Sequence, residues 1–332
     1  MPTLFHCRQK GGGKEAFMHI TDRLYNKKWG VFHHFLQYLQ NTPDNPHNMG
    51  TGVLSWDECV NAIDTELLAK TLNECGAGFY FITVMQGQPY LIAPNETFDK
   101  IVGTKPGEAC ATRDLISDLY DSLSKYGIDL YLYFTGDGPY KDDTIGRRFG
   151  FIEPRSDGVT LPFVEKWAAV LEEYAVRYGD KVCGWWIDGC YRDFLKFTDE
   201  LLDKFYYAIK KGNPNAVVAM NNGVFPEHRK YYSKEEFTCG EFGDFLAIPP
   251  SRFIDGAQAF TLAPLGKLQP GKEKYGAWGR YGCKRSGKFL DHYINCVNEA
   301  GGVVAVDIAL NRDGSLDAEQ VEALKQIKVD RG

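Results

Sequence analysis

The amino-acid sequence predicts a (β/α)8 TIM-like barrel, and three observations indicate it. Short apolar runs rich in β-branched and aromatic residues recur along the 332 residues, and amphipathic stretches of helical period separate them. Each run is almost continuously apolar, which is typical of parallel strands that helices cover on the outside. Long irregular segments follow several of these runs, as they do at the carboxyl face of such barrels.

Eight strands are expected, at residues 29–36, 78–85, 128–135, 182–188, 216–222, 244–248, 256–262 and 302–310. Helices are expected between them, including residues 64–75, 113–126, 161–178 and 191–211. The long segments after strands are residues 42–55, 86–112, 136–160 and 265–286. An open doubly wound sheet is the alternative, but no G-x-G-x-x-G loop follows the first strand.

Chain length and composition predict one domain spanning residues 1–332. The net charge of -6 and the absence of any Lys/Arg run longer than two argue against a nucleic-acid partner. No apolar stretch is long enough for a membrane span or a signal peptide, so we expect a cytoplasmic protein without a membrane partner. Nine cysteines without a C-x-x-C pair indicate reduced thiols. A homo-oligomer is a further expectation.

Polar side chains collect where the expected strands end. They are His33, His34, Gln86, Asp137, Asp188, Asn221, Asn222, Glu241, Gln258, Asp307 and Asn311. A charged group in an apolar strand is costly unless it is paired or solvated, so this clustering indicates a shared, water-filled cavity. Two carboxyl groups that flank such a cavity are what glycoside hydrolysis requires, and the expected substrate is a small carbohydrate or glycoside.

Six motifs occur in order along the chain: KWGVFHHF at 28–35, AKTLNECGAGFYFIT at 69–83, RDL at 113–115 before LYLYFT, WWIDG at 185–189, EFTCGEF at 236–242, and GGVVAVDIALNRDGSLDAEQVEALKQI from residue 301. In this order they resemble the catalytic domain of the retaining α-L-fucosidases of glycoside hydrolase family 29. The resemblance extends over residues 25–328.

The resemblance implies roles for three residues. Asp188 matches the family's nucleophile, Glu241 its acid/base residue and His34 its sugar-binding histidine. Glu235 and Glu236 are substitutes for the acid/base. Neighbouring strand residues point to opposite faces, so His33 is expected to point away from the cavity if His34 faces it. The further expected contacts to substrate are Trp186, Asn222, Gln86, Tyr133, Tyr191, Gln258 and Trp278.

The chain also departs from the family pattern. The family's K-H-H-D-G-F run after the second strand reads MQGQPY here, which gives Gln86 and Gly87 in place of two histidines. The family's arginine after the fifth strand is absent, where Asn222 and Gly223 stand, and no W-E pair occurs near GAQAF. The C-terminal β-sandwich usual in the family is not expected here. The changed residues predict an altered sugar specificity on a retained nucleophile position.

The sequence therefore predicts a retaining exo-glycosidase that cleaves a terminal glycosidic bond by double displacement. Two alternatives stay open: a sugar-binding homologue that has lost catalysis, and a metal-dependent sugar isomerase or epimerase. The isomerase would need His34, Asp188, Glu241 and Asp307 to converge on a metal. The residue spacing itself requires no metal or cofactor, and we expect none.

Overall fold

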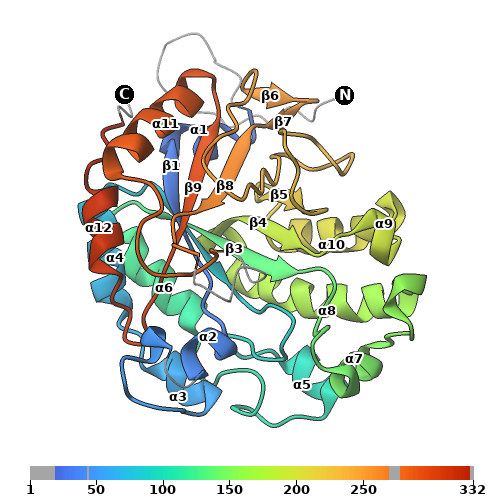
Figure 1. The fold of residues 1–332 in the computed structure, drawn as a ribbon. Coiled ribbons are helices and arrows are strands. Elements are labelled where there is room, and N and C mark those ends of the chain that lie inside the picture. Colours follow the sequence, from blue (N-terminus) through green and yellow to red (C-terminus); the bar gives the residue numbers. More distant parts are fainter. Residues whose placement is uncertain (1–18, 43–44, 269–276, 330–332) are drawn as a thin grey trace, which may run out of the picture.

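The computed structural model describes residues 19–42, 45–268 and 277–329. Their core is a seven-stranded parallel sheet that curls into a half-barrel, in the order β5-β4-β3-β2-β1-β9-β8 (Figure 1). Its strands are β1 (Trp29–His33), β2 (Phe79–Thr83), β3 (Asp129–Thr135), β4 (Val182–Asp188), β5 (Val217–Met220), β8 (Phe260–Pro264) and β9 (Val303–Ile308). A TIM-like α/β fold is therefore confirmed.

The helices cover the outer face of this sheet (Figure 1). The longer ones are α4 (Thr65–Cys75), α6 (Leu115–Ser124), α8 (Leu161–Tyr178), α10 (Asp199–Gly212) and α11 (Gly287–Glu299). Asp64, Asp114 and Thr160 cap three of them with a side-chain oxygen that accepts a backbone N–H. None of the helices among the described residues has the length and apolar character that crossing a membrane requires.

Side chains alternate between two apolar layers. One face of the sheet packs against the helices, and the other fills the inside of the curl with aromatic rings, among them Phe32, Phe81, Tyr131, Trp186 and Phe260. This inner cluster ends where the strands end at their carboxyl side. Polar side chains of the same parity, two positions further along, therefore project beyond the packed rings into open space.

The prediction of a sixth strand at residues 244–248 is wrong. Those residues form bends and turns, and Asp244 pairs with Arg285 instead. The segment 236–242 lies between β5 and β8, where the Glu236 N–H donates to Val218 and the Phe242 N–H donates to Leu262. Its bridges to the region of β8 are isolated, so it is no regular strand.

Shorter elements occupy the segments that follow the strands. α2 (Gln37–Asn41), η1 (Pro46–Asn48) and α3 (Trp56–Asn61) follow β1, α5 (Glu96–Val102) follows β2, and α7 (Asp143–Phe149) and η2 (Arg155–Asp157) follow β3. The remaining elements are α1 (Asp22–Lys27), η3 (Gly179–Lys181), α9 (Arg192–Leu195), β6 (Phe253–Ile254), β7 (Ala257–Gln258) and α12 (Ala318–Leu324). The long segments thus build one end of the sheet.

Candidate active site

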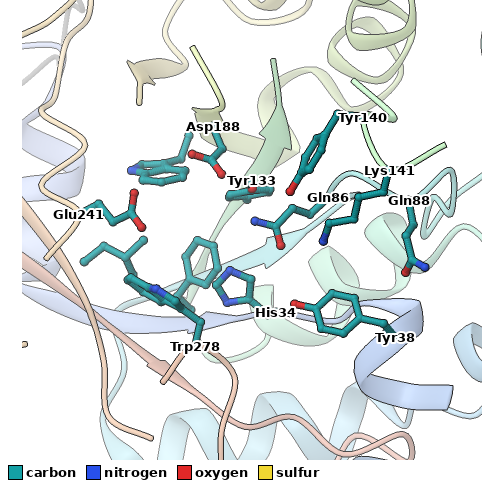
Figure 2. Close-up of a pocket in the computed structure, with 13 residues that line it drawn as sticks. His34, Tyr38, Gln86, Gln88, Tyr133, Tyr140, Lys141, Asp188, Glu241 and Trp278 are labelled. Atoms are coloured by element: carbon teal, nitrogen blue, oxygen red, sulfur yellow. Dashed lines mark hydrogen bonds between the residues drawn. The ribbon is translucent and has the colours of Figure 1, made fainter. Parts of the chain in front are cut away.

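A cavity of about 400 Å³ opens at the carboxyl ends of the strands, where TIM-like folds place their chemistry. Thirteen residues line it (Figure 2): Phe32, His34, Tyr38, Gln86, Gln88, Tyr133, Tyr140, Lys141, Trp186, Asp188, Glu241, Leu262 and Trp278. Seven of them are residues that the sequence singled out: Asp188, Glu241, His34, Trp186, Gln86, Tyr133 and Trp278.

Asp188 ends β4, with its carboxylate held on the inner side of the sheet. The Tyr133 hydroxyl donates a hydrogen bond of 2.6 Å to Oδ2 of Asp188. The Tyr133 ring stacks on Trp186 with centroids 5.4 Å apart, so packing fixes the phenol beneath the carboxylate. No Lys or Arg side chain of the described residues forms an ion pair with Asp188, whose carboxylate therefore remains available to the cavity.

Glu241 reaches the same cavity from the irregular segment 236–242. Gly240 lets this segment approach β8 closely, because its φ is +53° and a Cβ atom there would lie 1.7 Å from the Phe260 carbonyl oxygen. Glu241 then forms an isolated bridge with Leu262 at the inner side of β8. The main-chain geometry thus carries the acid of EFTCGEF to the cavity that Asp188 also faces.

The Asn221 side chain joins the two acids. Its Nδ2 donates to Oδ1 of Asp188 at 2.7 Å and to Oε2 of Glu241 at 2.6 Å. Its Oδ1 accepts the Gly223 N–H, which fixes the orientation of the amide. Because the two carboxyl oxygens share one donor nitrogen, they can be no more than about 5.3 Å apart.

The environment of Glu241 favours its protonated form. Burial, and after it the negative charge of Asp188, raise its pKa, while the hydrogen bond from Asn221 lowers it; together they bring the pKa to about 8. A carboxyl group with this pKa still holds its proton at neutral pH. It can therefore act as an acid beside the carboxylate of Asp188.

His34 is held by a second carboxylate. Its Nδ1 lies 2.7 Å from Oδ2 of Asp307, and the other oxygen of Asp307 accepts the Gly279 N–H. With Asp307 as acceptor, Nδ1 is the donor, and Nε2 has no hydrogen-bond partner among the described residues. His33 points to the opposite face, where the Tyr80 hydroxyl contacts its ring and burial lowers its pKa to about 3.

Three of the expected substrate contacts do not line the cavity. Gln258 is fully buried in β7, just before the amino end of β8, whereas the cavity lies at the carboxyl ends of the strands. There it accepts a hydrogen bond from Arg252 and donates one to the Gly301 carbonyl. Asn222 accepts the Arg192 N–H and so braces a loop. Tyr191 lies near Asp188, whose charge raises the pKa of the phenol, but it is not among the lining residues.

The two acids named as substitutes for Glu241 are engaged elsewhere. Glu235 is buried and accepts the backbone N–H groups of Met220 and Tyr231, and burial raises its pKa to about 8. Glu236 pairs with Lys210 and accepts the Tyr206 hydroxyl. Glu235 thus joins the turn at Tyr231 to the end of β5, Glu236 joins the segment 236–242 to α10, and neither lines the cavity.

Sequence reasoning missed several residues of the site. Asn221 was placed at the strand end, but its neighbour Asn222 was chosen as the ligand. The lining residues Tyr38, Gln88, Tyr140 and Lys141 come from segments after strands, where no periodicity indicates direction. The alternation of β5 could have identified Asn221, because Val217 and Ala219 share its parity and pack in the inner cluster.

Asp137 is a further buried acid close to Asp188. Burial chiefly, with the nearby charge of Asp188, raises its pKa to about 7 against the lowering effect of the Thr135 hydrogen bond. The Thr135 hydroxyl donates to its carboxylate, and Arg155 lies 3.9 Å away.

Among the residues that the structure describes, no group of three or more His, Cys, Asp or Glu side chains is arranged to hold a metal ion.

No protein-family model matches the chain, and no similar sequence is found among curated proteins. Solved structures do match its fold. An α-L-fucosidase of family GH29 from Bacteroides thetaiotaomicron superposes with a TM-score of 0.62 at 17% identity, covering 98% of this chain and 75% of that one. The α-L-fucosidase AlfC from Lactobacillus casei, solved with α-L-fucose, has a TM-score of 0.64 at 16% identity and coverages of 93% and 96%.

An endo-fucoidan hydrolase, P5AFcnA of glycoside hydrolase family 107, is similar to the same extent. Its TM-score is 0.64 at 14% identity, with 91% of this chain and 92% of that chain covered. The fold and the cavity thus define a TIM-like α/β protein with two acidic side chains at its strand ends. Its fold is that of these α-L-fucosidases and fucoidan hydrolases, which confirms the sequence resemblance at the level of fold.

Proposed function

We propose that this protein is a retaining glycoside hydrolase that acts on a fucose-type sugar. The observation that carries the proposal is the placement of Asp188 and Glu241 on one cavity, with oxygens no more than about 5.3 Å apart through Asn221. Retaining enzymes hold their two carboxyl groups about 5 to 5.5 Å apart, whereas inverting enzymes need about 6.5 to 9.5 Å for an intervening water.

In the first step, a carboxylate oxygen of Asp188 attacks the anomeric carbon as the bond to the leaving oxygen breaks. Glu241 transfers its proton to that oxygen, and a glycosyl ester on Asp188 results. In the second step, the ionised Glu241 takes a proton from water, and the water oxygen attacks the same carbon. The ester bond to Asp188 breaks, and the sugar leaves with its original configuration.

The surrounding side chains fit this chemistry. Tyr133 and Asn221 each donate to the carboxylate of Asp188 and so orient it, while the raised pKa keeps Glu241 protonated for the first step. Phe32, Leu262 and Trp278 supply an apolar wall. A 6-deoxy sugar such as fucose carries a methyl group that this wall can bury, and the fucose-acting enzymes of similar fold support that choice.

The test is hydrolysis of 4-nitrophenyl α-L-fucopyranoside by the parent, Asp188→Asn, Glu241→Gln and the control Asp193→Asn. Asp193 is exposed, and its carboxylate makes no hydrogen bond among the described residues. We expect Asp188→Asn to lose at least about 10³-fold in kcat/KM, and Asp193→Asn to keep the parent's rate. Glu241→Gln should recover part of its rate with azide, which needs no general base.

Two results would contradict the proposal. If Asp188→Asn keeps turnover within about tenfold of the parent, Asp188 is not the nucleophile. If the parent binds fucosides but hydrolyses no member of a panel of α- and β-linked aryl glycosides, the protein is a sugar-binding homologue without catalysis.

A further inference from the structure

The cavity has two chemically different ends. Figure 2 shows Asp188 and Glu241 at one end, His34 in the middle, and a second group at the other end. The side chains of this second group are all able to donate hydrogen bonds, and none is a carboxylate: Tyr38, Gln86, Gln88, Tyr140 and Lys141. We call these five residues the donor end.

The polar groups of the donor end are not used in hydrogen bonds within the described part of the chain. None of its five side chains forms a hydrogen bond with another described residue. Oε1 of Gln88 is moreover buried without a partner. Buried polar groups are normally hydrogen-bonded, because leaving them unpaired costs free energy. A cavity wall with so many unused polar groups is therefore suited to a ligand that pairs with them.

The donor end is also a constructed wall and not a loose surface. The Lys141 N–H donates to the Gly87 carbonyl at 2.9 Å, which joins the segment after β3 to the segment after β2. Gly87 has a φ of +71°, and a Cβ atom there would lie 2.7 Å from the Tyr140 ring. Tyr140 thus fills the space that a side chain at position 87 would need, where the related fucosidase motif has a histidine.

Positive charge is concentrated at this end. The Lys141 ammonium lies 4.9 Å from the centre of the Tyr38 ring and 5.4 Å from that of Tyr140. No carboxylate of the described residues lies within ion-pair distance of it. Arg280 is only 8% exposed, makes no ion pair among the described residues, and lies close enough that its charge lowers the pKa of the Tyr38 phenol against the raising effect of burial.

The nearby acids do not cancel this charge. Asp137 is buried and lies next to Arg155, and Asp307 is bonded to His34 and Gly279. Both carboxylates are thus already paired within the protein. The donor end therefore presents a lysine, two phenols and two amides to the cavity, and no carboxylate of the described residues forms a hydrogen bond or an ion pair with any of them.

From these contacts we propose that the donor end is a subsite for an anionic substituent of the glycan, a sulfate ester or a carboxylate, with Lys141 as its cation. The inference rests on the proposed glycosidase function, because it places the anion on the same substrate that Asp188 attacks. A charge-assisted contact of this kind contributes about 1.5 to 3 kcal/mol, so it separates charged from neutral glycans by about tenfold or more.

The anionic subsite can be tested by measuring binding to a variant that does not turn over its substrate. The Asp188→Asn protein is titrated calorimetrically with 4-nitrophenyl α-L-fucopyranoside, with its 2-O-, 3-O- and 4-O-sulfates, and with a fucosyl disaccharide that carries glucuronic acid. We expect one charged ligand to bind about tenfold or more tighter than the neutral one, with a preference that shrinks as salt rises. A preference for a sulfate assigns the anion as a sulfate ester, and one for the glucuronide assigns it as a carboxylate.

Adding Lys141→Gln to Asp188→Asn should remove that preference. The matched control, Lys70→Gln, changes an exposed lysine on the outer helix α4 and should keep it. Equal binding of charged and neutral ligands, or a preference that survives Lys141→Gln, would overturn the anionic subsite. Hydrolysis of the neutral aryl fucoside by the parent would then leave the proposed glycosidase function intact, so the two proposals fail separately.

Discussion

The Tyr133 hydroxyl donates a 2.6 Å hydrogen bond to Oδ2 of Asp188, from a ring that is itself stacked on Trp186. A phenol held in this way orients the carboxylate and stabilises its charge. The bond ties the proposed nucleophile to the rigid inner cluster of the sheet and not to a loop. In the proposed reaction, such fixing on regular strands keeps the carboxylate within reach of one sugar carbon.

We predict that Tyr133→Phe lowers kcat/KM for an accepted aryl fucoside by about 10- to 100-fold, because a hydrogen bond to a charged group contributes about 1.5 to 3 kcal/mol. The ring and its stacking on Trp186 remain, so the melting temperature should change little. Steady-state kinetics and a thermal melt of the same preparation check both. An unchanged kcat/KM would show that the phenol does not serve Asp188 in turnover.

Asn221 should set the protonation of Glu241. In the parent, kcat/KM is expected to fall as the pH rises through about 8, because Glu241 must hold a proton to act as the acid. The Asn221 hydrogen bond lowers this pKa, so Asn221→Ala should move the basic limb of the pH profile upward while reducing the maximal rate.

Asn222→Ala is the control for this effect. It removes the neighbouring amide, which braces the Arg192 N–H away from the cavity, and should leave the basic limb in place. If the basic limb stays fixed in Asn221→Ala, or moves equally in both variants, the Asn221 side chain does not set the pKa of Glu241.

Folding stability should depend on pH through Glu241. The pKa of its carboxyl is about 8 in the folded protein against 4.5 ordinarily, so the folded state holds a proton that the unfolded state loses between these pH values. Stability from this group therefore falls as the pH rises from about 4.5 to about 8. Glu241→Gln cannot ionise, so its melting temperature should gain on the parent by a few degrees between pH 5 and pH 8.

The comparison of the parent with Glu241→Gln also controls for the other buried acids. Asp137 and Glu235 also have raised pKa values, of about 7 and about 8, but both groups are present in the parent and in Glu241→Gln. Their contributions cancel in the difference between the two melting temperatures. A difference that is the same at pH 5 and pH 8 would mean that Glu241 is not held protonated.

Gly87→Ala should disturb the donor end specifically. A side chain at a φ of +71° is strained by about 1 to 3 kcal/mol, and its Cβ would also collide with the Tyr140 ring. Gly103→Ala is a matched control, because its φ is +83° and nothing lies within 4 Å of the added Cβ. Both variants should lose stability, but only Gly87→Ala should raise KM. Equal KM values in the two variants would contradict a binding role for the Tyr140 wall.

The sequence predicted those parts of the fold that have strong periodicity. β4 and α8 lie at the expected residues 182–188 and 161–178, because a continuous apolar run and a capped amphipathic stretch each specify one structure. The segment 236–242 escaped prediction because isolated bridges, and no repeated pattern, hold it in place. A close approach such as that of Gly240 to Phe260 depends on residues far apart in sequence.

The candidate site was predicted in the same uneven way. Asp188 stands at the end of a strand with a clear apolar pattern and belongs to the WWIDG motif, so its position at the cavity could be inferred. Choosing Asn221 over Asn222 requires the register of β5, since adjacent strand residues face opposite sides. Tyr140 and Lys141 reach the cavity through a loop contact with Gly87, which no local pattern encodes.

The central claim is that Asp188 becomes covalently bound to the sugar, with Glu241 as its acid/base partner. The most direct measurement is mass spectrometry of the peptides released after inactivation with 2-deoxy-2-fluoro-α-L-fucosyl fluoride. The account predicts one fluoroglycosyl group, carried by the peptide that contains Trp185, Trp186 and Asp188, and its loss in Asp188→Asn. A label on any other residue, or turnover of this reagent with inversion at the anomeric carbon and no labelled protein, would contradict it.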